Sequence, residues 1–366
     1  MLVNFKVKGF KGFEEEFEIN FLKSKNYDFN EQCILNGNIK NIIVYGKNSV
    51  GKSNFGLAVM DIVSHLEDKN VGPKLYDNYL NINSDIAEFH YKFQFNNDII
   101  DYYYIKKDLR ELVFEELKLN GEIILCHDYI NNISDYQGAN KISPTLNYEF
   151  YTNGSKLRYF LTNSSLENTS PLHKFIKFIA NMLWFRTLDE NRYIGYKTKS
   201  DDYLKFILDD KSLRNEFETL LNEAGIDGKL AVRTNPNDGV KTLYFNKNDK
   251  FLPFFATASS GTKALYTFFY WYNTAKDASF ICIDEFDAYY HFELAEKIVE
   301  ILKQMPQTQS MVTTHNTNLL SNKLMRPDCY FILTNNRLTS LPNATKMELR
   351  EGHNLEKLYI AGEFCE

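Results

Sequence analysis

The stretch that decides the fold runs from residue 41 to residue 66 and reads NIIVYGKNSVGKSNFGLAVMDIVSHL. Its centre, GKNSVGKS at residues 46–53, has the spacing GxxxxGK[ST], in which glycines let successive backbone N–H groups face phosphate oxygens. The apolar run NIIVY before it predicts a buried parallel strand. The apolar spacing after it predicts an amphipathic helix from about residue 53 to residue 66. Strand, loop and helix in this order predict a phosphate-binding loop.

The polar residues of this loop have separate expected contacts. Lys52 is predicted to bridge the β- and γ-phosphates of ATP, and the hydroxyl of Ser53 is predicted to hold Mg²⁺. The N-terminus of the following helix adds positive potential. The residues expected to surround the phosphates are Gly46, Lys47, Asn48, Ser49 and Gly51. A glycine-rich turn that binds nothing is the weaker interpretation, because both flanking elements have the expected pattern.

A second apolar run, Phe280–Ile283, ends in two acidic residues. Asp284 is predicted to hold Mg²⁺, directly or through water, and Glu285 is predicted to take a proton from the attacking water. Taken alone, the pattern is weak, and solvated acids at the end of a strand would be the better interpretation. The phosphate-binding loop in the same chain favours the catalytic interpretation.

Two further segments carry candidate site residues. His315 follows the next apolar strand, where it could reach the γ-phosphate, although a lone histidine is more often structural. Ser259, Ser260 and Gly261 open an aromatic-rich helix, and hydroxyls with a glycine at a helix start bind anions well. A plain serine cap is the alternative, and the order of the motifs along the chain favours a nucleotide site.

Composition excludes several classes of protein. The chain has 366 residues, with 42 Lys and Arg against 48 Asp and Glu, so its formal net charge is −6. This charge argues against an extended basic sleeve for nucleic acid, although a local basic patch stays open. The sequence shows no apolar run long enough to span a membrane and no secretory signal, which predicts the cytoplasm. Five scattered cysteines predict neither a disulfide frame nor a zinc ribbon.

The pattern along the chain predicts an α/β fold with a mixed sheet. We expect an ATPase lobe over residues 1–127 with an antiparallel meander at 86–126, an inserted and mainly helical lobe over 128–240, and a second ATPase lobe over 241–366. Within the insertion, helices are predicted near 172–184, 201–208 and 213–224. After it, strands are predicted at 242–245, 251–255, 280–283, 310–313 and 330–333, with helices at 261–273 and 292–303.

The order of these motifs resembles the ATPase heads of the ABC class. More closely, it resembles the AAA-labelled, ABC-type ATPases related to the OLD (overcoming lysogenisation defect) nucleases. The matching segments lie in the first 60 residues and in about 250–366, and they are YGKNSVGKSN, ATASSGTKAL, CIDEFDAYYH, VTTHNTNLL and LEKLYIAGEF. The lobe between them is covered weakly.

The resemblance implies an arrangement of two chains. In such heads two copies enclose two ATP molecules, so that Ser259–Thr262 of one copy would cap the γ-phosphate held by the other. Asp287 and His291 match a loop that crosses the dimer interface, and Lys11 matches a basic position near the nucleotide. The glutamine loop of the family is not evident, although Gln94 lies in the corresponding general region.

Departures from the family narrow the expected function. The segment SSGT replaces the transporter sequence LSGGQ, which points away from transport. The chain ends soon after the ATPase motifs, which predicts a stand-alone form without the nuclease domain. We therefore expect an ATPase that regulates a separate effector, a nuclease or a toxin, in bacterial anti-phage defence. One alternative is a RecF-like DNA repair ATPase that binds DNA. Another is an ATP clamp without turnover, which the presence of Glu285 argues against.

Overall fold

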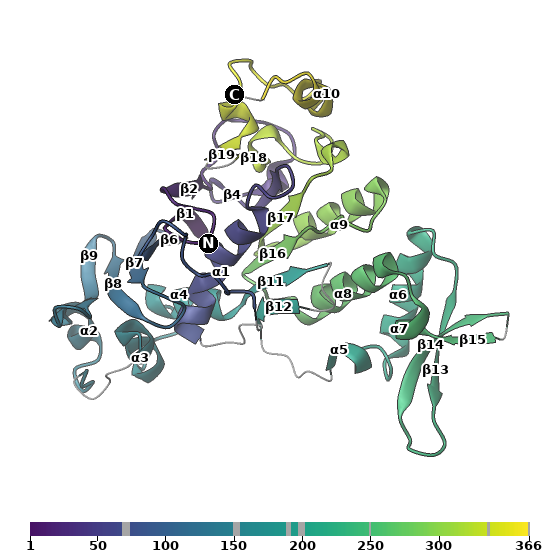
Figure 1. The fold of residues 1–366 in the computed structure, drawn as a ribbon, viewed down its shortest axis with the longest axis horizontal. Helices are drawn as coiled ribbons and strands as arrows, with labels where there is room; N and C mark the ends of the chain where they lie inside the picture. Colours follow the sequence, from purple (N-terminus) through teal and green to yellow (C-terminus); the bar gives the residue numbers. More distant parts are fainter. Residues whose placement is uncertain are drawn as a thin grey trace.

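The computed structural model describes residues 1–67, 74–148, 154–187, 192–196, 202–248, 250–334 and 337–364. Two seven-stranded sheets make up its larger part, and helix α1 (Lys52–Glu67) lies between them. Figure 1 shows one sheet on each side of α1, with a separate three-stranded sheet at the far right of the view. The predicted α/β class with a mixed sheet and an antiparallel subdomain is confirmed.

The central sheet is mixed. Its inner strands run parallel, and its two outer strands, β12 and β19, pair antiparallel with their neighbours. In spatial order the strands are β12 (Arg192–Gly195), β11 (Met182–Arg186), β16 (Phe280–Asp284), β17 (Gln309–Thr314), β5 (Asn41–Tyr45), β18 (Tyr330–Thr334) and β19 (Arg337–Ser340). The inner strands β16, β17 and β5 are buried throughout, as their apolar sequences require. Because they run parallel, their carboxyl ends meet at one edge.

The second large sheet is antiparallel, and its strands β6 and β7 alternate between buried and partly exposed residues. In spatial order they are β10 (Ile133–Asp135), β9 (Glu122–Asp128), β8 (Leu112–Leu119), β7 (Asp98–Lys106), β6 (Ala87–Phe95), β1 (Leu2–Lys8) and β2 (Phe17–Asn20). Asn120 and Gly121 connect β8 to β9 with φ angles of 53° and 86°, the left-handed pair that a two-residue hairpin turn requires. The predicted meander over residues 86–126 is confirmed.

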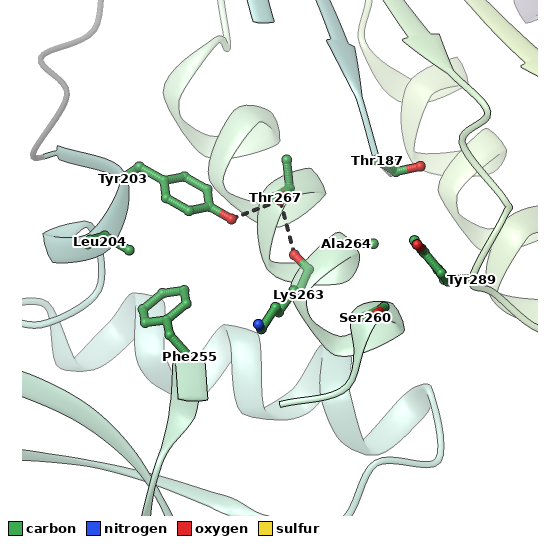
Figure 2. A pocket seen from close by; sticks show the side chains of 9 residues that line it. All are labelled: Thr187, Tyr203, Leu204, Phe255, Ser260, Lys263, Ala264, Thr267 and Tyr289. Carbon is green, nitrogen blue, oxygen red and sulfur yellow. Dashed lines mark hydrogen bonds between the residues drawn. The ribbon is translucent and has the colours of Figure 1, made fainter. Parts of the chain in front are cut away.

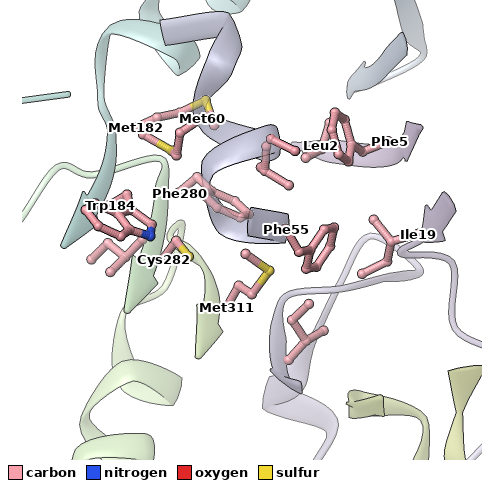
Figure 3. Packing of buried hydrophobic residues seen from close by; sticks show 14 of the residues in the cluster. Leu2, Phe5, Ile19, Phe55, Met60, Met182, Trp184, Phe280, Cys282 and Met311 are labelled. Carbon is pink, nitrogen blue, oxygen red and sulfur yellow. The ribbon is translucent and has the colours of Figure 1, made fainter. Parts of the chain in front are cut away.

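Helix α1 packs both sheets into one core (Figure 3). Toward the antiparallel sheet, the ring of Phe55 lies 6.3 Å from that of Phe5 and 5.3 Å from that of Phe17. Toward the central sheet, Gly56 lets the helix approach closely, because a Cβ there would lie 3.0 Å from Trp184 Nε1 and 3.2 Å from Cys282 Sγ. The first residues of α1 are thereby held at the carboxyl edge of the central sheet.

A smaller core lies around helix α8 (Ser260–Thr274). The elements that enclose it are α5 (Asp202–Lys205), α6 (Lys211–Glu223), β13 (Lys229–Thr234), β14 (Lys241–Lys247), β15 (Lys250–Pro253) and α7 (Phe254–Thr257). Tyr266 and Phe269 of α8 belong to this core, whereas Tyr270 and Trp271 belong to the main one. Helix α8 therefore joins the two cores.

The remaining elements cover the outside of the two cores. The helices among them are α2 (Gln137–Ile142), α3 (Lys156–Asn163), α4 (Pro171–Ala180), α9 (Phe292–Gln304), α10 (Leu355–Ile360), η1 (Glu31–Cys33), η2 (Thr317–Leu319), η3 (Pro327–Cys329) and η4 (Leu341–Asn343). Strands β3 (Ile34–Leu35) and β4 (Asn38–Ile39) form a small hairpin of their own. None of the helices in the described ranges has the length and apolar content needed to cross a membrane.

The insertion predicted over residues 128–240 differs from the expectation. It contains helices, but it also contributes β11 and β12 to the central sheet and β13 to the three-stranded sheet. The helix predicted to reach residue 184 ends at Ala180, because the run Met182–Arg186 pairs with β16. A short apolar run fits a helix or a strand equally well, and pairing decides between them. The predicted lobe boundaries at 127 and 240 stay a prediction.

A second local prediction is wrong in part. The strand predicted over residues 251–255 ends at Pro253, and Phe254–Thr257 forms the short helix α7 instead. The predicted helices at 261–273 and 292–303 are confirmed as α8 and α9, and the short apolar strands after residue 280 are confirmed as β16, β17 and β18.

Candidate active site

Three parallel strands bring the predicted motifs to one edge of the central sheet. The phosphate loop follows β5, Asp284 ends β16 with Glu285 directly after it, and His315 follows β17. The register places Thr314 opposite Tyr45, and it places Ile283 opposite Val312. Segments that are more than 200 residues apart in the chain therefore meet at this edge, as expected of a site at the carboxyl ends of parallel strands.

The phosphate loop curls around the ammonium group of its own lysine. Lys52 Nζ donates to the carbonyl oxygens of Gly46 at 2.8 Å and of Lys47 at 3.0 Å. Ser49 and Gly51 have φ angles of 67° and 106°, so both residues take the left-handed conformation that closes the loop. Burial lowers the pKa of Lys52, and the nearby carboxylates of Glu285 and Asp284 oppose that shift. Lys47, Asn48 and Ser49 are exposed.

The Asp284 side chain is completely buried beside the start of α1. Thr313 Oγ1 donates to Asp284 Oδ1 at 2.7 Å, and the hydroxyl of Ser53 lies close enough to this carboxylate to favour its charged form. Its other oxygen, Oδ2, is buried and accepts no hydrogen bond in the described structure. Burial raises the pKa of Asp284, whereas the nearby hydroxyls of Ser53 and Thr313 lower it.

This donor set fits a magnesium ion. Mg²⁺ prefers oxygen ligands and is commonly held by one or two protein groups, with water and phosphate oxygens completing its shell. The buried lone pair on Asp284 Oδ2 and the neighbouring hydroxyl of Ser53 supply two such groups. No cluster of three or more His, Cys, Asp and Glu side chains that could hold a metal by itself occurs in the described residues.

Glu285 turns away from the strand that precedes it. Its φ of 50° is left-handed, which is uncommon for a residue with a side chain and reverses the direction of the chain here. Its N–H donates to Thr313 Oγ1 at 2.8 Å, and its carbonyl oxygen accepts from Thr187 Oγ1 at 2.7 Å. Its carboxylate accepts from Arg186 Nη2 at 2.7 Å and is 24% exposed. Two threonines thus hold the backbone of Glu285 while its carboxylate stays accessible.

Arg186 and Thr187 are site residues that the sequence analysis missed. Arg186 is the last residue of β11, and Thr187 follows it. The register places Arg186 opposite Asp284. The predicted helix over 172–184 hid this strand. A signal was present, because MLWF followed by Arg-Thr repeats the pattern of FICI followed by Asp-Glu, an apolar run that ends in polar residues.

His315 and Asp287 lie close to each other on the other side of β16. Thr314 Oγ1 donates to Asp287 Oδ2 at 2.7 Å, and Asp287 is buried. Burial raises the pKa of Asp287, whereas the hydrogen bond from Thr314 and the charge of His315 lower it. The side chain of His315 is exposed at the same edge as the phosphate loop. His291 is exposed at the start of α9, where its side chain makes no cap.

The segment Ser259–Gly261 begins α8. Ser259 Oγ accepts from Thr262 N–H at 3.2 Å and therefore caps the helix, as the plain interpretation predicts, whereas the side chain of Ser260 is exposed. Gly261 lies against the loop after β16, because a Cβ there would lie 2.9 Å from the carbonyl oxygen of Tyr289.

A cavity of about 370 Å³ opens at the start of α8 (Figure 2). Figure 2 shows Ser260 and Tyr289 at one side of it and Tyr203 at the other, with Thr187 above. The described residues that line it include none from the phosphate loop. Ser260 therefore opens onto a space separate from the phosphate loop of its own chain.

Lys11 and Gln94, the two remaining candidates, lie at different edges of the central sheet. The turn that contains Lys11 borders the phosphate loop, because Phe13 lies against Gly51, and Lys11 Nζ donates to the carbonyl oxygen of Asp77 at 2.7 Å. Gln94 lies elsewhere. Its Oε1 accepts from Asn38 Nδ2 at 3.1 Å, just before β5 begins, which places Gln94 at the edge opposite the phosphate loop.

Comparisons with solved structures find Smc heads. One is an Smc head bound to the C-winged helix domain of ScpA, at 14% identity and a TM-score of 0.46, covering 93% of this chain and 97% of that one. Another is the SMC head domain from Thermotoga maritima, at 15% identity and a TM-score of 0.43, covering 95% of this chain and 99% of that one. A third, from Pyrococcus furiosus, is an Smc head with an extended coiled coil bound to the C-terminal domain of ScpA, at 14% identity, a TM-score of 0.45 and coverages of 93% and 96%.

Sequence comparison identifies a family. No curated protein sequence matches the chain. The profile of the family described as "AAA domain, putative AbiEii toxin, Type IV TA system" matches residues 42–321, which is more than half of the 366 residues. The match begins with β5 and the phosphate loop and extends past His315. The chain therefore belongs to this family of AAA-domain proteins.

Proposed function

We propose that the chain binds ATP with Mg²⁺ at the carboxyl edge of the central sheet and hydrolyses it. The observation that carries this proposal is the meeting of Lys52, Ser53, Asp284 and Glu285 at that edge. A phosphate loop alone would bind a nucleotide. The adjacent carboxylates add a metal ligand and a proton acceptor, which hydrolysis requires.

Each residue has a role in the proposed reaction. Lys52 and the loop's N–H groups neutralise and orient the phosphates, and Ser53 and Asp284 hold the metal. Mg²⁺, when bound, supplies charge that stabilises the transferring phosphoryl group. Glu285 takes the proton of the attacking water, and its partial exposure gives water access to the carboxylate.

We also propose that the site is completed by a second copy of the chain. The exposed Ser260 opens onto a cavity to which no described residue of its own phosphate loop contributes. In an ATP-enclosing dimer this serine and Gly261 would face the γ-phosphate of the partner's nucleotide. Light scattering tests this part. It measures the oligomeric state of the slowly hydrolysing variant E285Q with and without ATP.

The biological part of the proposal is regulation of a separate effector. Its support is the resemblance of the motifs to the OLD-related ATPases and the family description, which names a toxin of a toxin–antitoxin system. We propose a role in bacterial anti-phage defence on this basis. Steady-state ATPase activity of the purified chain tests the enzymatic part, and co-expression with each neighbouring gene product, followed by co-purification, tests the effector.

One observation favours the alternative, a RecF-like ATPase that binds DNA. Residues 229–253, which form β13 to β15, contain 5 Lys and Arg and 2 Asp, a net charge of +3 in a chain of net charge −6. Lys247 and Lys250 lie directly opposite each other, an arrangement that a bound polyanion would relieve. Arg233 lies 3.4 Å from the ring centroid of Phe251.

Salt-dependent binding decides between the two functions. If this sheet contacts DNA, the logarithm of the binding constant falls steeply with the logarithm of the salt concentration. The double variant K247E/K250E should then make this slope shallower by about 2, one for each lost phosphate contact. Arg110, which is exposed in the meander, supplies the matched control R110E. If the chain did not bind DNA at low salt, the RecF-like alternative would be excluded and the effector hypothesis would remain.

A further inference from the structure

The two carboxylates of the candidate site share a cation from their own chain. Arg186 Nη2 lies 2.7 Å from Glu285 Oε2, and Arg186 Nε lies 3.5 Å from Asp284 Oδ2. The backbone sets this geometry, because β11 and β16 run parallel with Arg186 opposite Asp284. The Thr187 hydroxyl, which donates to the Glu285 carbonyl oxygen at 2.7 Å, fixes the next residue as well.

The guanidinium faces the oxygen that a metal ion would use. Asp284 Oδ2 is the buried oxygen that accepts no hydrogen bond from the part of the chain that the structure describes, and Arg186 Nε at 3.5 Å is too far to donate one to it. The other oxygen of Asp284 is already engaged by Thr313. Arg186 therefore supplies charge to Asp284 without occupying its free lone pair.

Within the described residues, the other cation near the two carboxylates is Lys52, whose charge acts on both of them. Lys52, the nearest ammonium group of the phosphate loop, is engaged by the carbonyl oxygens of Gly46 and Lys47. Arg186 stays protonated at every ordinary pH, so only movement of its side chain can remove the charge. That side chain is 28% exposed, which leaves it room to move.

We propose that Arg186 is a positioning residue that acts as the resident counter-ion of Asp284 and Glu285, and that Mg²⁺ displaces its charge from Asp284 when the nucleotide site is loaded. In the empty site the guanidinium donates a hydrogen bond to the Glu285 carboxylate and so occupies one of the oxygens that would otherwise meet water. Metal loading would release that carboxylate to water. Hydrolysis would thereby be linked to a correctly filled site. This inference rests on the proposed function.

The test measures competition between Arg186 and Mg²⁺. Replacing arginine by glutamine in R186Q removes one positive charge close to the metal ligand, so the Mg²⁺ concentration for half-maximal ADP binding should fall by about 10- to 100-fold. R186K keeps the charge and should stay within about threefold of the unmodified chain. An unchanged or higher Mg²⁺ requirement in R186Q would overturn the proposal, as would loss of ADP binding at saturating Mg²⁺.

A second measurement needs neither nucleotide nor activity. In EDTA, R186Q should melt about 2–5 °C below the unmodified chain, because two carboxylates lose their partner. Mg²⁺ alone should restore most of that loss, since it replaces the missing charge. Adding D284N to R186Q should abolish the response to Mg²⁺. The control is R337Q, an exposed arginine in β19 of the same sheet, which should show no Mg²⁺-dependent shift.

The two proposals fail differently. If the unmodified chain binds no ATP, the proposed function is wrong whatever the melting curves show. If it binds and hydrolyses ATP but Mg²⁺ does not restore the melting temperature of R186Q, Arg186 is structural and the counter-ion proposal is wrong.

Discussion

Two clusters of buried charge lie near helix α1, and they are built differently. In the first, Asp61 accepts from Lys106 Nζ at 2.7 Å, Tyr104 OH at 2.8 Å and Tyr79 OH at 2.9 Å. The side chains of both Asp61 and Lys106 are 0% exposed. Both oxygens of this carboxylate accept hydrogen bonds from buried side chains, so no lone pair of the cluster faces solvent through a gap among the described residues.

The second cluster, at the carboxyl edge of the central sheet, is left open. Asp284 Oδ2 accepts no hydrogen bond from any described residue, and Arg186 and Glu285 are 28% and 24% exposed. The comparison shows that a buried acid marks a binding site only when its partners leave a lone pair and a route to it. Asp61, which is equally buried, links α1 to the antiparallel sheet through Tyr104 and Lys106.

The largest expected effect tests the open cluster. E285Q keeps the shape and most hydrogen bonds of the side chain but removes the proton acceptor, so ATP turnover should fall by about 10²–10⁴-fold while ATP affinity stays near normal. The ATP-bound dimer should persist, because hydrolysis normally opens it. Steady-state ATPase measurement and size-exclusion chromatography with ATP check both expectations.

Normal turnover in E285Q would exclude Glu285 as the base and leave Asp287 or His315 as the next candidates. The matched control is E293Q, which changes an exposed glutamate in the first turn of α9 and should leave turnover unchanged.

The next effect tests the closed cluster. K106M leaves Asp61 buried without its cation, which should reduce the free energy of unfolding by about 3–5 kcal/mol. ATP affinity of the protein that remains folded should not change. Urea titration measures the loss, and the double variant D61N/K106M should recover part of it. If K106M kept its stability but lost ATP binding, the Asp61 cluster would be part of the nucleotide site and the contrast between the two clusters would be wrong.

A smaller effect separates the two faces of the nucleotide site. K52A removes the ammonium group at the centre of the phosphate loop and should weaken ATP binding by about 100-fold or more. S260R should leave binding intact and abolish turnover, because the added side chain blocks the face toward the partner. Equal loss of ATP binding in both variants, measured by calorimetry, would refute a site shared between two copies.

The smallest effect concerns the cost of keeping the open cluster. Burial raises the pKa of Asp284 above its value in the unfolded chain, so the folded state disfavours the charged carboxylate. The protonated carboxyl therefore contributes stability at low pH, and this contribution is lost as pH rises through the folded pKa. D284N removes that cost and should stabilise the metal-free chain by about 1 kcal/mol at pH 7. The gain should shrink toward pH 4 and below, where Asp284 is protonated. Urea titrations in EDTA at the two pH values measure it.

The opposite pH trend would mean that Arg186 outweighs burial at Asp284. In that case D284N would destabilise the chain at pH 7 and become neutral in acid. The same titrations on D287N give a second buried acid of this edge, whose pKa burial also raises.

Local patterns in the sequence determined the phosphate loop and the ends of the strands around it. Two glycines at fixed spacing, an apolar strand before them and a helix after them are short-range features, and they predict Lys52 and Ser53 without knowledge of the rest of the chain. Asp284 and Glu285 at the end of an apolar run form a weaker pattern, and the phosphate loop elsewhere in the sequence was needed to interpret them. These predictions needed no contact between distant residues.

Only the tertiary structure decided which residues of other strands join them. Arg186 lies 98 positions before Asp284 in the chain, and it reaches that carboxylate only because β11 pairs in parallel register with β16. The apolar run that forms β11 fits a helix as well as a strand, so the sequence alone leaves its pairing open. Gln94 shows the reverse, because the antiparallel sheet carries it to the opposite edge. Strand register acts over long range, and a local pattern contains no information about it.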